Sequence, residues 1–209
     1  MIQDKEITFE NLVKNLPDHI KEKLEELKDF RERKDFHPEE SCFKHIEIVT
    51  NRAIEFGDIN LIMVGIFHDI HKLDCYKNNL KKFNKKMSFG HDKAAKNTVL
   101  GDESVRRFIS DFNGDPDTVG EICGEHMRIH KLGVMRRIKQ DRLMNLPFFP
   151  KLIAFSVFDD MLLSDEESLK KAKMLFDLAV KFQDDAISDE EIKFLRMSGK
   201  MVNKKRNEK

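Results

Sequence analysis

Cysteine is scarce in this sequence, and its spacing argues against a disulfide framework. The 209 residues contain only Cys42, Cys75 and Cys123, and no two of them form a CxxC pair. An odd number of widely spaced cysteines is typical of a reducing compartment, where thiols serve as small apolar side chains.

Long apolar runs are also absent. The longest, residues 61–67, is too short to cross a bilayer. The first six residues lack the basic-then-apolar order of a signal peptide. The sequence therefore predicts a soluble cytoplasmic protein without membrane contact.

Charge of one sign is not in excess either. The chain has 38 basic and 38 acidic side chains, so no global field draws it toward nucleic acid or an anionic membrane. Any contact with a phosphorylated ligand must therefore be local. One lysine-rich stretch favours a solvated face, with an RNA contact as the alternative. It contains Lys77, Lys81, Lys82, Lys85 and Lys86.

Strand patterns, internal repeats and linkers are missing, whereas apolar residues recur at helical intervals. The almost wholly apolar segment 59–70 is expected at the centre of the core. The other expected helices cover 9–33 with a break at Pro17, 39–56, 91–100, 102–112, 115–129, 151–163, 165–186 and a last short one from Ser188. Residues 72–89 fit a loop or a solvated helix.

The predicted fold class is therefore all-α, a helical bundle with one main domain. Residues 36–198 form that domain, and residues 1–35 supply N-terminal helices that pack on it. Residues 199–209 are expected to be a basic, disordered tail.

Two adjacent polar residues, His68 and Asp69, close the apolar run 61–67. Burying either side chain is costly unless a partner compensates. Neighbours on a helix point about 100° apart, so both reach one metal ion only in a groove between helices. The candidate partners on other helical segments are His45, His91, His126 and Asp159 or Asp160.

Imidazole and carboxylate donors without thiolate suit a divalent metal ion in an open catalytic site. The candidates are manganese, iron, cobalt, nickel, zinc and magnesium. One ion or two fit this number of donors.

The order of a lone His, an adjacent His-Asp pair and a distant Asp resembles the signature of the HD superfamily of metal-dependent phosphohydrolases. The chain is similar in particular to the HD domain of bacterial CCA-adding tRNA nucleotidyltransferases. The similar blocks run in order over residues 36–162: His37-Pro38-Glu39, followed by His45, then Phe67–Lys72, Gly90-His91-Asp92, Glu125–His130 and Phe155–Met161. No segment of the size of the nucleotidyltransferase head precedes His37, so we do not expect CCA addition.

Two positions depart from that family's pattern. His71 replaces the glycine of its HD-x-GK motif and adds a bulky titratable group beside the metal pair. Its ADARG motif loses the glycine and arginine here, which leaves Asp159 and Asp160 as alternatives. The alignment favours Asp159, and a helical step of about 100° lets only one of them face the site.

The resemblance implies a role for each of these residues. The metal ligands are His45, His68, Asp69 and Asp159 (or Asp160). His91 and His126 either bind metal directly, which would complete a second metal centre, or they orient the metal ligands from outside or contact the substrate. Asp69 and Lys72 are the expected catalytic residues, and Lys72, Arg128 and His130 the expected substrate-binding ones. Favourable charge or capping at a helix end is the alternative for these last three.

The implied activity is hydrolysis of a phosphoester by water acidified on the metal. The resemblance points to 2′,3′-cyclic phosphates or 2′-nucleotides, as free nucleotides or at RNA ends. A phosphohydrolase of (d)NTPs is one alternative, although neither a base pocket nor a polyphosphate cradle can be identified. A non-catalytic RNA-binding module is the other.

Overall fold

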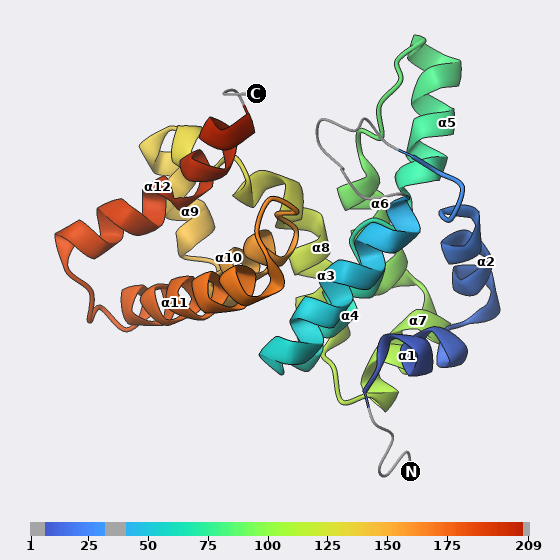
Figure 1. Ribbon diagram of the computed structural model, residues 1–209, viewed down its shortest axis with the longest axis horizontal. Helices are drawn as coiled ribbons and strands as arrows, with labels where there is room; N and C mark the ends of the chain where they lie inside the picture. The colour runs from blue at the N-terminus through green and yellow to red at the C-terminus, as the bar shows by residue number, and fades with distance from the viewer. Residues whose placement is uncertain (1–6, 32–40, 207–209) are drawn as a thin grey trace. The chain divides into compact units, whose positions relative to one another are not determined.

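The computed structural model describes residues 7–31 and 41–206, with side chains through Ser198 (Figure 1). All regular elements in these ranges are helices, which confirms the all-α prediction. The chain divides into two compact units, Met1–Gly124 and Glu125–Lys209. The domain bounds predicted from the sequence, 1–35, 36–198 and 199–209, stay a prediction beside this division. Neither a linker nor a change in composition marks the observed division, because it falls inside a helix.

The first unit begins with two short helices, α1 (Phe9–Asn15) and α2 (Asp18–Glu26), with the predicted break at Pro17 between them. Phe9 of α1 packs edge-on against Phe43 of α3 (Cys42–Phe56), with ring centroids 5.8 Å apart. The N-terminal helices therefore belong to the same packed unit as α3. The predicted helix over 39–56 begins at Cys42 in the structure, and residues 32–40, with His37-Pro38-Glu39, lie outside the described residues.

Helices α3 and α4 (Ile59–Phe67) cross at very short range in the first unit. Every residue from Leu61 to Phe67 is buried, as expected for the centre of a core. A Cβ atom added at Gly65 would lie 2.8 Å from Thr50 Oγ1 and 2.9 Å from Thr50 Cα. Only glycine permits this approach, so Gly65 fixes the spacing of the two helices.

The apolar helix ends earlier than the sequence predicted. Residues 59–70 were expected to be helical, but α4 stops at Phe67 and residues 68–71 form a turn. His68 is the C-cap of α4. His68 and Asp69 therefore lie where a helix ends rather than within its length.

Helix α5 (Lys72–Phe83) follows that turn directly, which settles the open choice between loop and helix for most of this stretch. Its base is held by an ion pair between Lys23 Nζ and Asp74 Oδ2 at 2.5 Å. Tyr76 also packs edge-on against Phe30, with centroids 5.3 Å apart. Beyond these contacts α5 extends away from the rest of its unit (Figure 1).

Three helices follow α5, and their start signals are as the sequence indicated. Helix α6 spans His91–Gly101, α7 spans Glu103–Asp111 and α8 spans Pro116–Ile129. The Asp102 carboxylate accepts hydrogen bonds from Ser104 N and Val105 N and so caps α7. Asp115 does the same for Asp117 N and Thr118 N at the start of α8.

The second unit contains the end of α8, a 3₁₀ turn (Leu132–Val134), α9 (Arg137–Met144), α10 (Phe149–Phe158), α11 (Asp165–Gln183) and α12 (Asp189–Arg206). The apolar helix expected over 151–163 is α10, which ends at Phe158 and leaves Asp159 as its C-cap. Helix α12 continues through Arg206, so the backbone is helical where a disordered tail was predicted from residue 199. Within the two described ranges, no helix has both the length and the apolar content to cross a membrane.

Candidate metal centre

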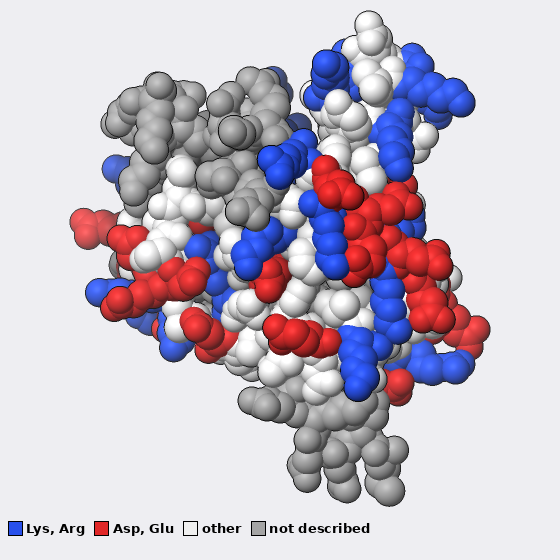
Figure 2. All heavy atoms as spheres, turned by 45° about the vertical axis from the view of Figure 1, so that its right-hand side comes forward, with Lys and Arg blue, Asp and Glu red and all other residues white. Residues whose placement is uncertain are grey.

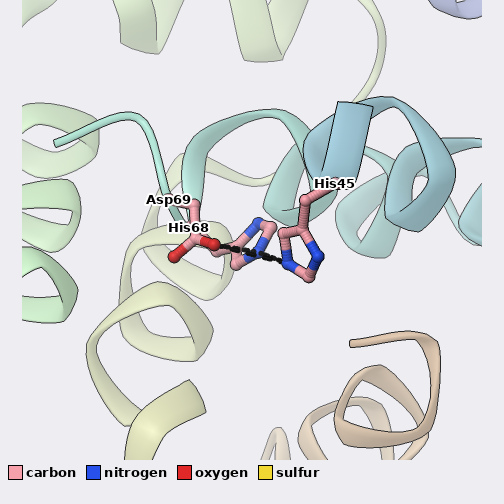
Figure 3. A group of neighbouring side chains, drawn as sticks. All are labelled: His45, His68 and Asp69. Atoms are coloured by element: carbon pink, nitrogen blue, oxygen red, sulfur yellow. Dashed lines mark hydrogen bonds and ion pairs between the residues drawn. The ribbon is translucent and has the colours of Figure 1, made fainter. Parts of the chain in front are cut away.

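The candidate centre in the first unit combines the first turn of α3 with the end of α4. His45 lies on α3 one turn after its N-cap Ser41, which accepts a hydrogen bond from Lys44 N. His68 and Asp69 follow the last residue of α4. All three metal-ligand candidates are buried, and their side chains point toward one another (Figure 3). The close crossing at Gly65 holds the two helices together nearby.

Three donor atoms of these residues form a nearly equilateral triangle. His45 Nε2 lies 3.3 Å from both His68 Nε2 and Asp69 Oδ2, and the third side, from His68 Nε2 to Asp69 Oδ2, is 3.2 Å. A tetrahedral ion with donors at about 2.0–2.1 Å requires donor separations of roughly 3.3–3.4 Å. The triangle therefore matches three ligand positions of such an ion, and the residues present fit a divalent cation.

The ring of His68 is oriented by the backbone. Its Nδ1 lies 3.0 Å from the carbonyl oxygen of Gly65, which only accepts hydrogen bonds, so Nδ1 carries the proton. Its Nε2 faces Asp69 Oδ2 at 3.2 Å, a contact that is favourable only with a proton or a metal ion between the two atoms. A metal ion would satisfy both.

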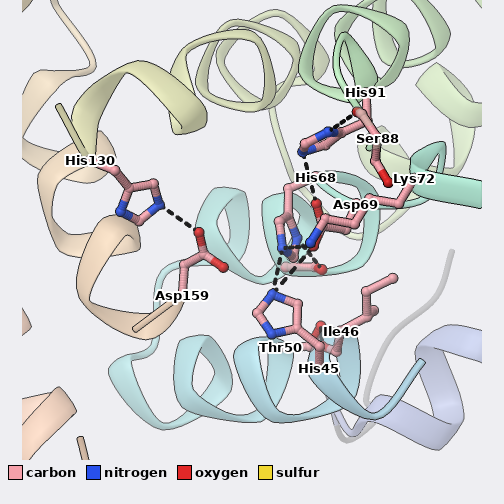
Figure 4. A network of polar contacts seen from close by, with 11 residues as sticks. His45, Ile46, Thr50, His68, Asp69, Lys72, Ser88, His91, His130 and Asp159 are labelled. Atoms are coloured by element: carbon pink, nitrogen blue, oxygen red, sulfur yellow. Dashed lines mark hydrogen bonds and ion pairs between the residues drawn. The ribbon is translucent and has the colours of Figure 1, made fainter. Parts of the chain in front are cut away.

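His91 repeats this arrangement on the other carboxylate oxygen (Figure 4). Its Nδ1 donates to the Ser88 carbonyl at 2.7 Å, and its Nε2 lies 3.2 Å from Asp69 Oδ1. Burial lowers the pKa of His91, but the hydrogen bond and charge of Asp69 outweigh it and raise that pKa above its ordinary value. The predicted proximity of His91 to the metal pair is therefore observed.

Asp69 is the hub of the cluster and is held ionised. Burial alone would raise its pKa, but the charges of His68 and Lys72 and the hydrogen bonds from His68 and His91 hold it well below the usual range. Lys72 Nζ lies 2.8 Å from Asp69 Oδ2, and the lysine is itself buried. Lys72 thus neutralises a carboxylate of the protein, a contact that the sequence did not predict.

The remaining predicted site residues belong to the second unit. His126 is buried on α8, and Arg128 makes an ion pair of 2.5 Å with Glu125 along the same helix. His130 Nε2 lies 2.6 Å from Asp159 Oδ2, which joins a predicted substrate-binding residue to a predicted metal ligand (Figure 4). Asp160 is buried, and its Oδ1 accepts from Leu162 N at 3.1 Å.

His71, expected beside the metal pair, makes its hydrogen bonds elsewhere. Its Nδ1 lies 3.1 Å from Asp74 Oδ2 and its Nε2 lies 2.7 Å from Thr98 Oγ1. The ring therefore links the base of α5 to α6. A glycine at this position would leave both groups without this link.

Two groups that orient the candidate ligands escaped the sequence reasoning. They are the carbonyl oxygens of Gly65 and Ser88, which fix the rings of His68 and His91. Backbone carbonyls have no signature in a sequence. The only available signal is the spacing, because each carbonyl comes three residues before its histidine.

The chain matched no protein-family model, no curated protein and no solved structure. Functional inference therefore depends on the residues and their geometry.

Proposed function

We propose that this protein is a metal-dependent phosphohydrolase of the HD type, acting on 2′,3′-cyclic phosphates or similar small phosphoesters of nucleotides or RNA ends. The observation that carries the proposal is the buried triangle of His45 Nε2, His68 Nε2 and Asp69 Oδ2, with sides of 3.2–3.3 Å. The substrate class comes from the sequence resemblance, and the metal from the geometry of the donors.

In this proposal His45, His68 and Asp69 hold the cation, and the sequence resemblance adds an aspartate, Asp159 or Asp160, as a further ligand. We favour Asp159 over Asp160, because the 2.6 Å contact with His130 orients its carboxylate as partners of ligating groups commonly do. When bound, a divalent cation supplies a Lewis acid that acidifies water and offsets negative charge on phosphoryl oxygens.

The other residues of the first unit prepare Asp69 for this task. Lys72 and His91 contact different carboxylate oxygens, Oδ2 and Oδ1, and so fix the plane of the carboxylate. An ionised, oriented Asp69 can bind metal through one oxygen and accept a proton from water at the other. From the sequence resemblance, Lys72 and Arg128 are also proposed to attract the substrate phosphate.

Elemental analysis of the purified protein, together with a phosphoester panel, tests the proposal. We expect one or two equivalents of a transition metal, and hydrolysis of 2′,3′-cyclic AMP with added Mn²⁺, Co²⁺ or Ni²⁺. His68→Ala should lose both metal and activity. His19→Ala, which removes a half-exposed histidine of the same unit, should retain both.

Two results would contradict the proposal. One is a wild-type protein that takes up no metal on titration. The other is a folded His68→Ala variant that hydrolyses the panel as the wild type does. Competition between dNTPs and 2′,3′-cyclic nucleotides in one assay separates the proposed substrates from the triphosphate alternative.

A further inference from the structure

The end of α5 concentrates charge of one sign in a chain whose net charge is zero. Residues 75–91 contain five lysines and no aspartate or glutamate. Figure 2 shows lysines gathered over α5, with uncharged residues at its far end. We call this surface the α5 tip and define it by its exposed side chains: Lys77, Leu80, Lys81, Lys82, Phe83, Lys85, Lys86, Met87 and Phe89.

Large apolar side chains are exposed among these lysines. Phe83 is 63% exposed and Phe89 is 79% exposed, and Met87 and Leu80 lie in the same short stretch. Scattered apolar residues on a surface need no explanation, but a cluster of them marks a binding site. The aromatic rings and the cations therefore form one surface.

The loop that follows α5 has a defined shape. Asn79 Nδ2 donates to the carbonyl oxygens of Met87 at 3.1 Å and Phe89 at 2.9 Å. Asn84 ends the helix in the left-handed region, at φ 51°. The backbone thus holds the exposed ring of Phe89 at a fixed place beside α5.

We propose that the α5 tip is a docking surface for single-stranded RNA. Lysines neutralise backbone phosphates, and exposed aromatic rings stack on bases that are not paired in a duplex. Among the described residues, Lys77 has an acidic partner, Glu26, in an exposed pair, whereas no ion pair engages Lys81, Lys82, Lys85 or Lys86. These four charges are available to a polyanion.

An anionic membrane is the competing partner for a basic surface with apolar residues. Helices that lie on membranes separate a wide apolar face from a polar one. Here Leu80 and Phe83 lie in the last turn of α5, whereas Met87 and Phe89 belong to the loop after Asn84, so the four side chains form no continuous apolar face along one helix. Separate rings flanked by lysines fit a single strand of phosphates and bases better.

The tip also connects directly to the candidate metal centre within the first unit. Ser88, in the loop, accepts a hydrogen bond from His91, whose Nε2 lies 3.2 Å from Asp69 Oδ1. The loop that carries Met87 and Phe89 therefore leads from the tip to the candidate metal centre. The further claim that the bound strand is the substrate, with its phosphorylated end at the metal, rests on the proposed function. The proposal that the tip binds RNA does not rest on it.

Fluorescence anisotropy with a labelled 12-nucleotide RNA, measured without added metal, tests the binding separately from any hydrolysis. Phe83→Ala/Phe89→Ala should weaken binding about tenfold or more, because two stacking rings are lost. Lys85→Gln/Lys86→Gln should reduce the slope of log affinity against log salt by about 1.4, roughly 0.7 for each lost phosphate contact. Two matched controls change exposed residues outside the tip: Lys170→Gln/Lys173→Gln on α11 and Phe194→Ala on α12. Neither should change the RNA affinity or its salt dependence.

Three results would overturn the docking surface. One is RNA binding that is undetectable or unaffected by the tip variants while circular dichroism shows them folded. Another is equal affinity for the single strand and for a duplex of the same length, since paired bases cannot stack on the rings. The third is tip-dependent sedimentation with phosphatidylserine vesicles in the absence of RNA binding. A wild-type protein that binds RNA through the tip but hydrolyses no ester of the panel would refute the proposed function and leave the docking surface standing.

Discussion

Replacing Gly65 by alanine should damage both the fold and the metal centre, because it separates the helices that carry the ligands. The new Cβ would lie 2.9 Å from Thr50 Cα, whereas ordinary contact begins at 3.4 Å. Helices α3 and α4 must therefore move apart locally by about 0.5 Å, more than the roughly 0.2 Å tolerance of metal–ligand distances. His45 belongs to α3 and His68 to the end of α4, so the crossing affects the distance between them.

The stability cost follows from two opposing effects. Overpacking of a core costs about 1–3 kcal/mol, and alanine offsets up to about 1 kcal/mol of it through its better helix propensity. We expect a net loss of about 1–2 kcal/mol in urea unfolding followed by circular dichroism. Metal affinity measured by calorimetry should fall about tenfold or more, which corresponds to at least ~1.4 kcal/mol.

The matched control is Gly101→Ala. This glycine also lies in a helix, α6, but a Cβ atom there would meet nothing within 4 Å, so the change should be neutral or stabilising. Thr50→Ala added to Gly65→Ala should restore part of the stability, because it removes Oγ1 but leaves Cα. If the unfolding free energy and the metal affinity of Gly65→Ala equal those of the wild type, the close crossing does not set the ligand spacing.

Three further predictions concern charge and metal. Asp69→Asn should lose the metal and, in EDTA, about 3 kcal/mol of stability, because it leaves Lys72 buried without its carboxylate; an equal loss in Asp74→Asn, whose partner Lys23 is part-exposed, would contradict this. Asp102→Ala should cost about 1 kcal/mol of unfolding free energy by removing the cap of α7. The hydrogen bond from Ser104, with those from the backbone, lowers the pKa of Asp102 in the folded protein. Urea unfolding at a series of pH values should therefore show the full stabilisation by Asp102 above about pH 4, and its loss as the pH falls through the pKa of the folded state. Finally, adding metal at 100 times its Kd to EDTA-treated protein should raise the unfolding free energy by about 2.7 kcal/mol, and a thermal transition unmoved by metal would exclude a preformed site.

Sequence reasoning located the candidate ligands of the first unit better than it located the ends of their helices. The apolar run before His68 identified a buried helix, and an imidazole and a carboxylate at its end implied partners. His45 lies beside them as the resemblance implied. The sequence nevertheless placed His68 and Asp69 within a helix, because apolar Ile70 continues the pattern past the point where the backbone turns.

What the sequence missed are contacts that depend on how the backbone turns and on packing between segments. Lys72 contacts the carboxylate of Asp69 three residues before it, and His71 contacts Asp74 and, on α6, Thr98. The bond between His130 and Asp159 joins positions 29 residues apart, which no helical periodicity relates. The division after Gly124 was invisible for the same reason, since the pattern of α8 runs through it unchanged.

The packing of Tyr76 on Phe30 gives the protein a spectroscopic reporter of its own. The chain has one tyrosine and no tryptophan, so emission excited at wavelengths that phenylalanine does not absorb comes from a single site at the base of α5. Unfolding of the first unit can therefore be followed by fluorescence, while circular dichroism follows the helices of both units. Quenching of the same signal would report, without any label, on ligands that arrive at α5.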